Sequence, residues 1–186
     1  GIGINISFIP PFEKLNQIEI GDKYAYISVT HKDNKGYKPK GFIGVDLNTT
    51  KHIAVSADPK TGNVMKFGKK APHIRKKYSR MKRLLQLHGR YRSLKKIKHR
   101  EANINTDLNH KISRSLVETA HKQRKGLRLE NLKGIRKRGG AKTFRYALNS
   151  WSFYQLRQFI EYKAKMLGVP VEYIAPQYTS KICSRC

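Results

Sequence analysis

The chain has 186 residues, of which 40 are Lys or Arg and only 12 are Asp or Glu, giving a formal net charge of +28. A hydrophobic content of 38% excludes a disordered basic tail, and no run approaches the ~20 apolar residues of a membrane-spanning helix. So dense a charge predicts a polyanionic partner, and we favour nucleic acid over an anionic membrane. Without a signal peptide or a disulfide framework, the expected compartment is the cytoplasm.

The first 40 residues contain short strand and turn patterns, of which "YAYISV" is the clearest. The chain begins with Gly rather than Met, so we interpret both of its ends as boundaries of a fragment. Residues 1–40 are therefore predicted to be a β-rich N-terminal segment.

From residue 41 the pattern predicts an antiparallel meander. "GFIGVDLNTTKHIAVSAD" is typical of two strands joined by a polar turn, and "NVMKFG" adds a third strand. Residues 69–100 hold 14 Lys and Arg and no acid, with apolar residues every three or four positions. This spacing predicts one long amphipathic helix with a basic outer face. A second helix is predicted in "NTDLNHKISRSLVETAH", with Asn105 and Asp107 as caps near its start.

The remaining elements are a strand, a basic loop, a helix and a final strand. "GLRLENL" predicts a short strand that ends in an acid, and "KGIRKRGGAKTFR" a Gly-containing loop. "LNSWSFYQLRQFIEYKAKML" predicts a helix that ends at Gly168 and Pro170, before the strand "VPVEYIA". The order β-β-β-α-α-β-α-β fits an α/β, ribonuclease H-like mixed sheet in residues 41–175, with a basic helical insertion at about residues 70–122.

Three acids lie in apolar strand contexts: Asp46 in "FIGVDLN", Glu130 in "LRLEN" and Glu172 in "PVEYI". A partly desolvated carboxylate is unfavourable unless a cation or hydrogen-bond donors compensate it. Two such acids from neighbouring strands would converge at one edge of a sheet and bind Mg²⁺ for phosphodiester hydrolysis. Asp46 and Glu130 are the candidates, although the pattern alone leaves a solvated surface role open for both.

Glu172 is left out of this candidate pair, because it lies on an alternating strand and its side chain is expected to face solvent. Other acids lie in turns or on polar helix faces and are interpreted as solvated surface charges: Glu13, Asp22, Asp33, Asp58, Glu101 and Glu118.

"GVDLN", "LRLENLKGI" and the ending "WSFYQLRQFIEYKAKMLGVPVEYIAPQYTSKICSRC" resemble the TnpB/OrfB proteins of bacterial and archaeal insertion sequences, over roughly residues 41–186. The resemblance implies a RuvC-like nuclease, related to type V CRISPR effectors, that cuts DNA guided by a transposon-derived RNA. It also implies that Asp46 and Glu130 are the first and second catalytic acids of a Mg²⁺ site. Residues 1–40 would then be the tail of a wedge-like domain.

The same resemblance implies a zinc ribbon, of which residues 176–186 would be the first half. Cys183 and Cys186 would be two of its four Zn²⁺ ligands. In the family a second C-x-x-C pair follows, and after it a third catalytic acid, an Asp; this chain has neither. We therefore expect the isolated chain to be inactive or nearly so.

Two hypotheses follow for the function. The first is a transposon-encoded, RNA-guided DNA endonuclease, present as an incomplete catalytic domain. The second is a catalytically inactive remnant that binds nucleic acid or regulates transposition. A ribosomal or chromatin-type basic protein would explain the charge but neither the acids in strands nor the "YTSKICSRC" ending.

The basic residues predict a channel for an RNA–DNA duplex, contacted through its backbone. They lie in residues 69–100 and 136–138 and at Lys142 and Arg145. Tyr78 and Tyr91 are suited to base stacking, but their place on the apolar stripe favours the core. Trp151 and Phe159 are also expected in the core.

Overall fold

The computed structural model describes residues 5, 7, 12–31, 34–47, 51–131 and 153–175. The chain divides into two units, Gly1–Lys35 and Gly36–Cys186. In the first unit, β1 (Lys14–Ile20) pairs antiparallel with β2 (Ala25–Thr30), with a register shift between Leu15 and Gln17. This hairpin confirms the predicted β-rich segment at the N-terminus.

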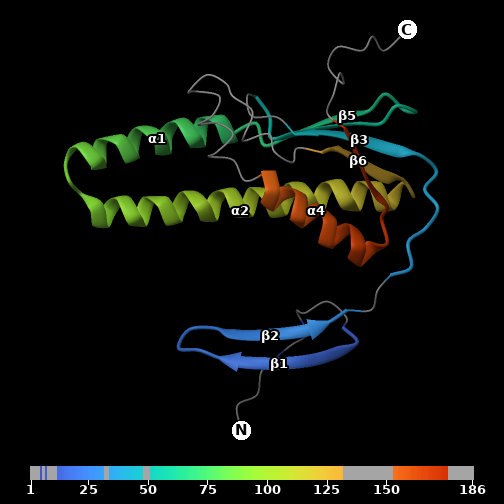
Figure 1. The fold of residues 1–186 in the computed structure, drawn as a ribbon, viewed down its shortest axis with the longest axis horizontal. Helices are drawn as coiled ribbons and strands as arrows, with labels where there is room; N and C mark the ends of the chain where they lie inside the picture. Colours follow the sequence, from blue (N-terminus) through green and yellow to red (C-terminus); the bar gives the residue numbers. More distant parts are fainter. Residues whose placement is uncertain are drawn as a thin grey trace. The chain divides into compact units, whose positions relative to one another are not determined.

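The second unit is built on a five-stranded mixed sheet with the order β5-β4-β3-β6-β7 (Figure 1). Its strands are β3 (Phe42–Leu47), β4 (Ala54–Ala57), β5 (Val64–Phe67), β6 (Gly126–Glu130) and β7 (Val171–Ile174). Neighbouring strands among β3, β4 and β5 pair antiparallel, whereas β6 runs parallel to β3 and β7 runs parallel to β6. The meander and the two later strands therefore lie where the order of elements predicted them.

Three helices belong to this unit: α1 (Ala71–Leu87), α2 (Tyr91–Lys122) and α4 (Phe153–Leu167). Helices α2 and α4 lie on the same side of the sheet (Figure 1). The core forms between them and the alternate apolar residues of β3 and β6, among them Val45 and Leu129. Helix α4 ends at Gly168, which has a φ of 66°, as its sequence predicts. The predicted α/β architecture with a mixed sheet is thus confirmed.

The prediction of one continuous helix over residues 69–100 is wrong. The chain reverses direction between α1 and α2, and Gly89 takes a φ of 63° there, a conformation that costs Gly little. Asn105 and Asp107 are not caps, because both lie inside α2; Asp107 instead accepts a hydrogen bond of 2.7 Å from Lys111, one turn later. Apolar spacing continues through the reversal, so periodicity alone did not reveal it.

The aromatic residues divide between core and surface. Tyr78 is buried as expected, at 7% exposure, but the core position predicted for Tyr91 is wrong, since its exposed fraction is 70%. Phe159 is half-buried and stacks on His110, with 3.9 Å between ring centroids. Trp151 lies outside the described residues. Within the described ranges, no helix combines the length and the hydropathy needed to cross a membrane.

Candidate active site

Asp46 lies on the face of the sheet opposite α2 and α4. Its neighbours Val45 and Leu47 are buried in the core, and Asp46 between them is exposed. Side chains alternate between the two faces of a strand, so this burial pattern sets the direction of the carboxylate. Asp46 therefore points away from the core.

Glu130 is the last residue of β6 and is half-buried. The parallel register pairs Val45 with Leu129, so one residue further along both strands brings Asp46 level with Glu130. Level residues of parallel neighbours face the same side of the sheet, and the strands lie about 4.8 Å apart. By extension of this register, the structure brings together the two acids that the sequence singled out, on the face of the sheet opposite α2 and α4.

This acid pair fits a hard divalent cation. Mg²⁺ is commonly bound by one or two carboxylates, with water and substrate phosphate completing its octahedral shell. In the part of the chain that the structure describes, no group of three or more His, Cys, Asp or Glu side chains is arranged to hold a metal. Two neighbouring carboxylates suit one such ion, with water and phosphate as its further ligands.

A second row of side chains lies beside the acid pair on the same face. Arg128 precedes Glu130 by two residues, and the register places it level with Glu172 on β7. Its guanidinium donates to Glu172 Oε2 from Nη2 at 2.8 Å and from Nε at 3.2 Å. Glu172 is exposed and ion-paired, in agreement with its omission from the acid pair.

The ring of Phe42 supports this second row from β3. The guanidinium carbon of Arg128 lies 4.5 Å from the ring centroid, a cation–π geometry. Gly126 makes room for the ring, because a Cβ there would lie 2.4 Å from Phe42 Cε1. The glycine at the start of β6 thus allows Phe42 to lie where it meets Arg128.

A row of cations follows α1. An open groove of about 500 Å³ runs along this helix, lined by Pro72, Arg75, Lys76, Ser79, Arg80 and Arg83. We call it the α1 groove.

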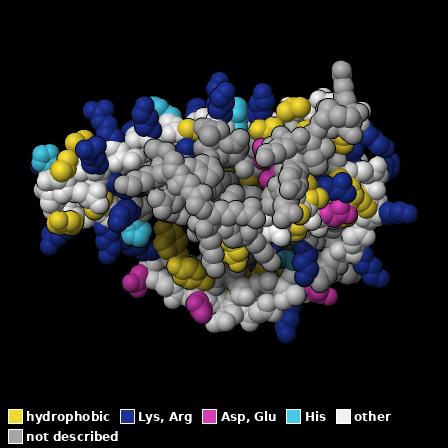
Figure 2. Space-filling model, turned by 45° about the horizontal axis from the view of Figure 1, so that its top comes forward, with side chains coloured by type: hydrophobic (Ala, Val, Ile, Leu, Met, Phe, Trp, Pro, Cys, Tyr) yellow, Lys and Arg dark blue, Asp and Glu magenta, His cyan; other side chains and the backbone are white. Residues whose placement is uncertain are grey.

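In the view of Figure 2, Lys and Arg side chains project around the molecule and Asp and Glu are few. The cations predicted at residues 136–138, Lys142 and Arg145 lie outside the described residues, as do Cys183 and Cys186.

The surface positions predicted for Asp58 and Glu101 are wrong. Asp58 is only 4% exposed, and its carboxylate accepts hydrogen bonds from the side chains of Lys125 and Thr61. The bond from Lys125, followed by that from Thr61, lowers the pKa of Asp58 to about 2. Glu101 is buried because α1 packs on α2, and Lys82 donates to it at 2.7 Å. The local sequence around these acids does not reveal their partners, because Lys125 and Lys82 lie in other parts of the chain.

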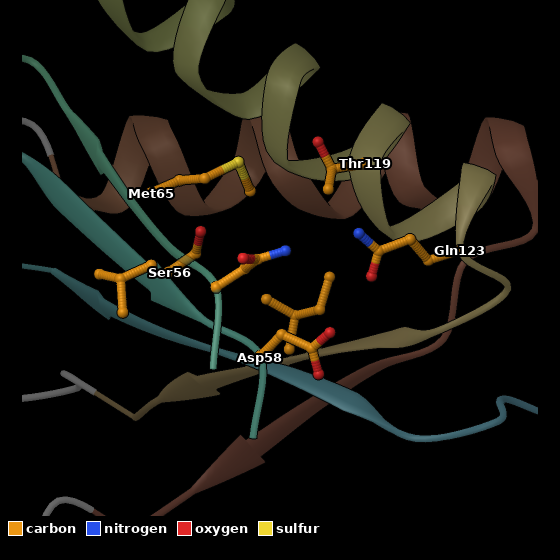
Figure 3. A pocket seen from close by; sticks show the side chains of 8 residues that line it. Ser56, Asp58, Met65, Thr119 and Gln123 are labelled. Atoms are coloured by element: carbon orange, nitrogen blue, oxygen red, sulfur yellow. The ribbon is translucent and has the colours of Figure 1, made fainter. Parts of the chain in front are cut away.

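Asp58 lines a cavity of about 220 Å³ with mixed polar and apolar walls (Figure 3). Ser56, Met65, Thr119 and Gln123 also line it, from β4, β5, α2 and the residue after α2. The Ser56 hydroxyl is buried and has no hydrogen-bond partner in the described ranges. Ser56 is buried on the helix side of the sheet, whereas Asp46 is exposed on the other side, so this cavity is separate from the acid pair.

Comparison with known proteins finds similarity to TnpB-like proteins and to CRISPR-associated endodeoxyribonucleases. The family model "Cas12f1-like, TNB domain" matches residues 153–186. TnpB-like protein MJ0751 of Methanocaldococcus jannaschii is 36% identical over 172 residues, which cover 82% of this chain and 60% of the relative. CRISPR-associated endodeoxyribonuclease Cas12f1 of Syntrophomonas palmitatica is 34% identical over 165 residues, or 80% of this chain and 32% of the relative.

Two solved structures share the fold. A chain of the Cas12f1-sgRNA-target DNA complex superimposes with a TM-score of 0.60 at 22% identity, covering 77% of this chain and 37% of that one. A chain of the CRISPR-Cas12f ternary complex gives a TM-score of 0.64 at 21% identity, covering 91% and 36%. At this level of identity the likeness establishes the fold alone.

The mixed sheet and its likeness to these chains define a RuvC-like α/β protein. The matched family model and relatives support membership of the TnpB family, whose similar proteins here include CRISPR-associated Cas12f endodeoxyribonucleases. The resemblance expected from the motifs is confirmed. The chain spans 60% of the length of the Methanocaldococcus relative and 32% of the Cas12f1 relative.

Proposed function

We propose that the chain is the RuvC-like catalytic part of a transposon-encoded, RNA-guided DNA endonuclease. The observation that carries the proposal is the acid pair, in which Asp46 and Glu130 lie level on neighbouring parallel strands. One relative is named an endodeoxyribonuclease, and one fold neighbour was solved with sgRNA and target DNA, which supports guide RNA and DNA as the partners of this chain.

Asp46 and Glu130 would hold the metal in this reaction. Mg²⁺ bound there supplies the charge that polarises a phosphodiester and lowers the pKa of an attacking water. The exposed position of Asp46 and the strand-end position of Glu130 suit contact with a substrate phosphate through the ion. We further propose that Cys183 and Cys186 contribute two thiolate ligands to a structural Zn²⁺ site.

Binding of Mn²⁺, a paramagnetic substitute for Mg²⁺, tests the metal site on the chain itself. We expect Asp46→Asn and Glu130→Gln each to weaken binding about tenfold or more, since even the loss of an outer-shell partner has an effect of that size. Asp107→Asn is the matched control, because Asp107 is an exposed acid paired with Lys111 on α2. Equal affinities of all three variants, measured by electron paramagnetic resonance, would remove the metal role.

Cleavage requires a second experiment, because the family resemblance predicts a third acid beyond Cys186. The chain is extended with the C-terminal segment of a TnpB relative and mixed with guide RNA, labelled target DNA and Mg²⁺. The endonuclease proposal predicts cleavage that Asp46→Asn abolishes and Asp107→Asn preserves.

A binding protein that does not cut is the second candidate. It is supported by the row of cations along the α1 groove, which would contact a phosphate backbone whether or not the acid pair cuts it. An extended chain that binds guide RNA and DNA but leaves the DNA intact would support this candidate.

A further inference from the structure

Arg128 lies one row away from the acid pair on the same face of the sheet. Glu130 follows it by two residues on β6, and two residues of a strand span about 6.6 Å. Successive phosphates of a nucleic-acid strand are separated by a similar length. A strand that runs along β6 with one phosphate at the acid pair therefore brings its next phosphate to the row of Arg128.

On the β3 side of Arg128, the residues in the same row have a small side chain or none. The register places Gly44 of β3 level with Arg128, and Ala57 of β4 level with Gly44. Both residues are exposed, and among the described residues a Cβ built at Gly44 meets Ala57 O alone, at 3.9 Å. A backbone can thus approach the guanidinium from the β3 side without meeting a long side chain from these two positions.

The guanidinium is already oriented. Phe42 stacks against it at 4.5 Å, and Glu172 Oε2 accepts both described hydrogen bonds, from Nε and Nη2. A guanidinium has five N–H donors, so these described bonds use two of them. The side chain of Arg128 is 44% exposed, which leaves it accessible from solvent.

Glu172 is a partner of Arg128 that a phosphate can replace. An exposed Arg–Glu pair contributes little to stability. A planar guanidinium forms bidentate hydrogen bonds with phosphate as readily as with carboxylate. Glu172 therefore orients the guanidinium of Arg128 and also competes with any phosphate that approaches this guanidinium.

We propose that Arg128 binds the backbone phosphate next to the one at the acid pair, exchanging Glu172 for it when a DNA or RNA strand enters. This inference rests on the proposed function, because it assigns a further contact between the same site and the same class of substrate. Arg128 is a positioning residue in this proposal, and it sets where along the strand the acid pair acts.

The test measures binding of a short, labelled single-stranded DNA to the full chain by fluorescence anisotropy, with Ca²⁺ in place of Mg²⁺. We expect Arg128→Gln to weaken binding about three- to tenfold, the effect of losing one charge-assisted contact. Arg128→Lys should recover only part of the loss, because an ammonium has no fork and stacks poorly on Phe42. Glu172→Gln should strengthen binding about twofold, because the competitor is weakened.

Arg114→Gln is the matched control. Arg114 is also an exposed Arg paired with a Glu, at 2.8 Å from Glu118, but it lies on α2 away from the acid pair. We expect it to change affinity less than twofold, by net charge alone. A DNA with uncharged methylphosphonate linkages adds a second readout, since Arg128→Gln should make no difference to it. Thermal melting of each variant confirms that it is folded.

Equal losses for Arg128→Gln and Arg114→Gln, or weaker binding by Glu172→Gln, would overturn the inference. If Mn²⁺ binding at the acid pair is intact in that case, the proposed function survives and only the role of Arg128 fails. A chain that binds no DNA at any salt concentration would overturn both. If Arg128→Gln does not fold, the comparison of Arg128→Lys with Arg114→Lys decides instead.

Discussion

At the scale of single residues, Asp58 is the most deeply buried acid in the described part of the chain. Its partner Lys125 is 67 positions away and follows α2, so the pair ties the turn after β4 to the end of that helix. Removing one partner of a buried ion pair leaves the other charge uncompensated, which is strongly destabilising. Asp58 therefore has a structural role, distinct from that proposed for Asp46.

We expect Asp58 to make the stability of the fold depend on pH in the acid range. Its pKa falls from the ordinary 3.8 to about 2, chiefly through the hydrogen bond from Lys125. Because the folded-state pKa is the lower one, the contribution of the carboxylate is fully present above about pH 4 and is lost as pH falls through about 2. Asp58→Asn should therefore lower the urea midpoint at neutral pH and flatten its dependence on pH between about 5 and 2.

Urea denaturation followed by circular dichroism at several pH values measures this effect. Asp107→Asn changes an exposed acid on α2 and should leave the profile close to that of the unsubstituted chain. An Asp58→Asn profile that ran parallel to the unsubstituted one would show that Asp58 does not titrate as the structure indicates.

At the scale of elements, the reversal between α1 and α2 decides which aromatic residues are in the core. Tyr78 within α1 is 7% exposed, whereas Tyr91 at the start of α2 is 70% exposed. We expect Tyr78→Ala to reduce the free energy of unfolding by about 3 kcal/mol, as for other large aromatic truncations in a core. Tyr91→Ala should change it by no more than about 0.5 kcal/mol.

Equilibrium unfolding in urea compares the two variants directly. They carry the same chemical change at two positions of one apolar stripe, so each serves as the control for the other. Similar losses at both positions would mean that Tyr91 is packed, as a continuous helix would have required, and would contradict the reversal at Gly89.

The order of the strands was predictable because each strand has its own local pattern, whereas the apolar spacing that α1 and α2 share concealed the boundary between them. The facing of Asp46 follows from alternation alone, since apolar residues flank it on both sides. The convergence of Asp46 with Glu130 also required their strands to be neighbours, and β3 and β6 are neighbours in the sheet. Their catalytic role stays a prediction.

Features that depend on distant contacts were not predictable in the same way. The burial of Asp58 depends on Lys125, and that of Glu101 on Lys82 of a different helix. The contact of Arg128 with Phe42 depends on the register of two strands and on the space left by Gly126. No periodicity or turn pattern encodes a register between strands separated by two helices.

At the scale of the whole molecule, the net charge of +28 remains uncompensated by the fold. Each ion pair neutralises one cation with one acid, so the pairs of Asp58 and Glu101 leave the excess of cations unchanged. Self-repulsion of this excess is relieved when a polyanion binds and its counterions are released. Affinity for nucleic acid should therefore fall steeply as salt rises.

The α1 groove should account for much of that salt dependence. One variant replaces its four cations by Gln: Arg75, Lys76, Arg80 and Arg83. If each contacts a phosphate, the slope of log affinity against log salt falls by about 0.7 per contact for a single strand, or roughly two to three in all.

The control removes the same charge at exposed lysines elsewhere: Lys14, Lys23, Lys60 and Lys111. We expect its slope to change by less than about one, because counterion release follows contacts made rather than total charge. Equal changes, measured by anisotropy over a salt series, would mean that binding follows net charge and that the α1 groove has no special part in it.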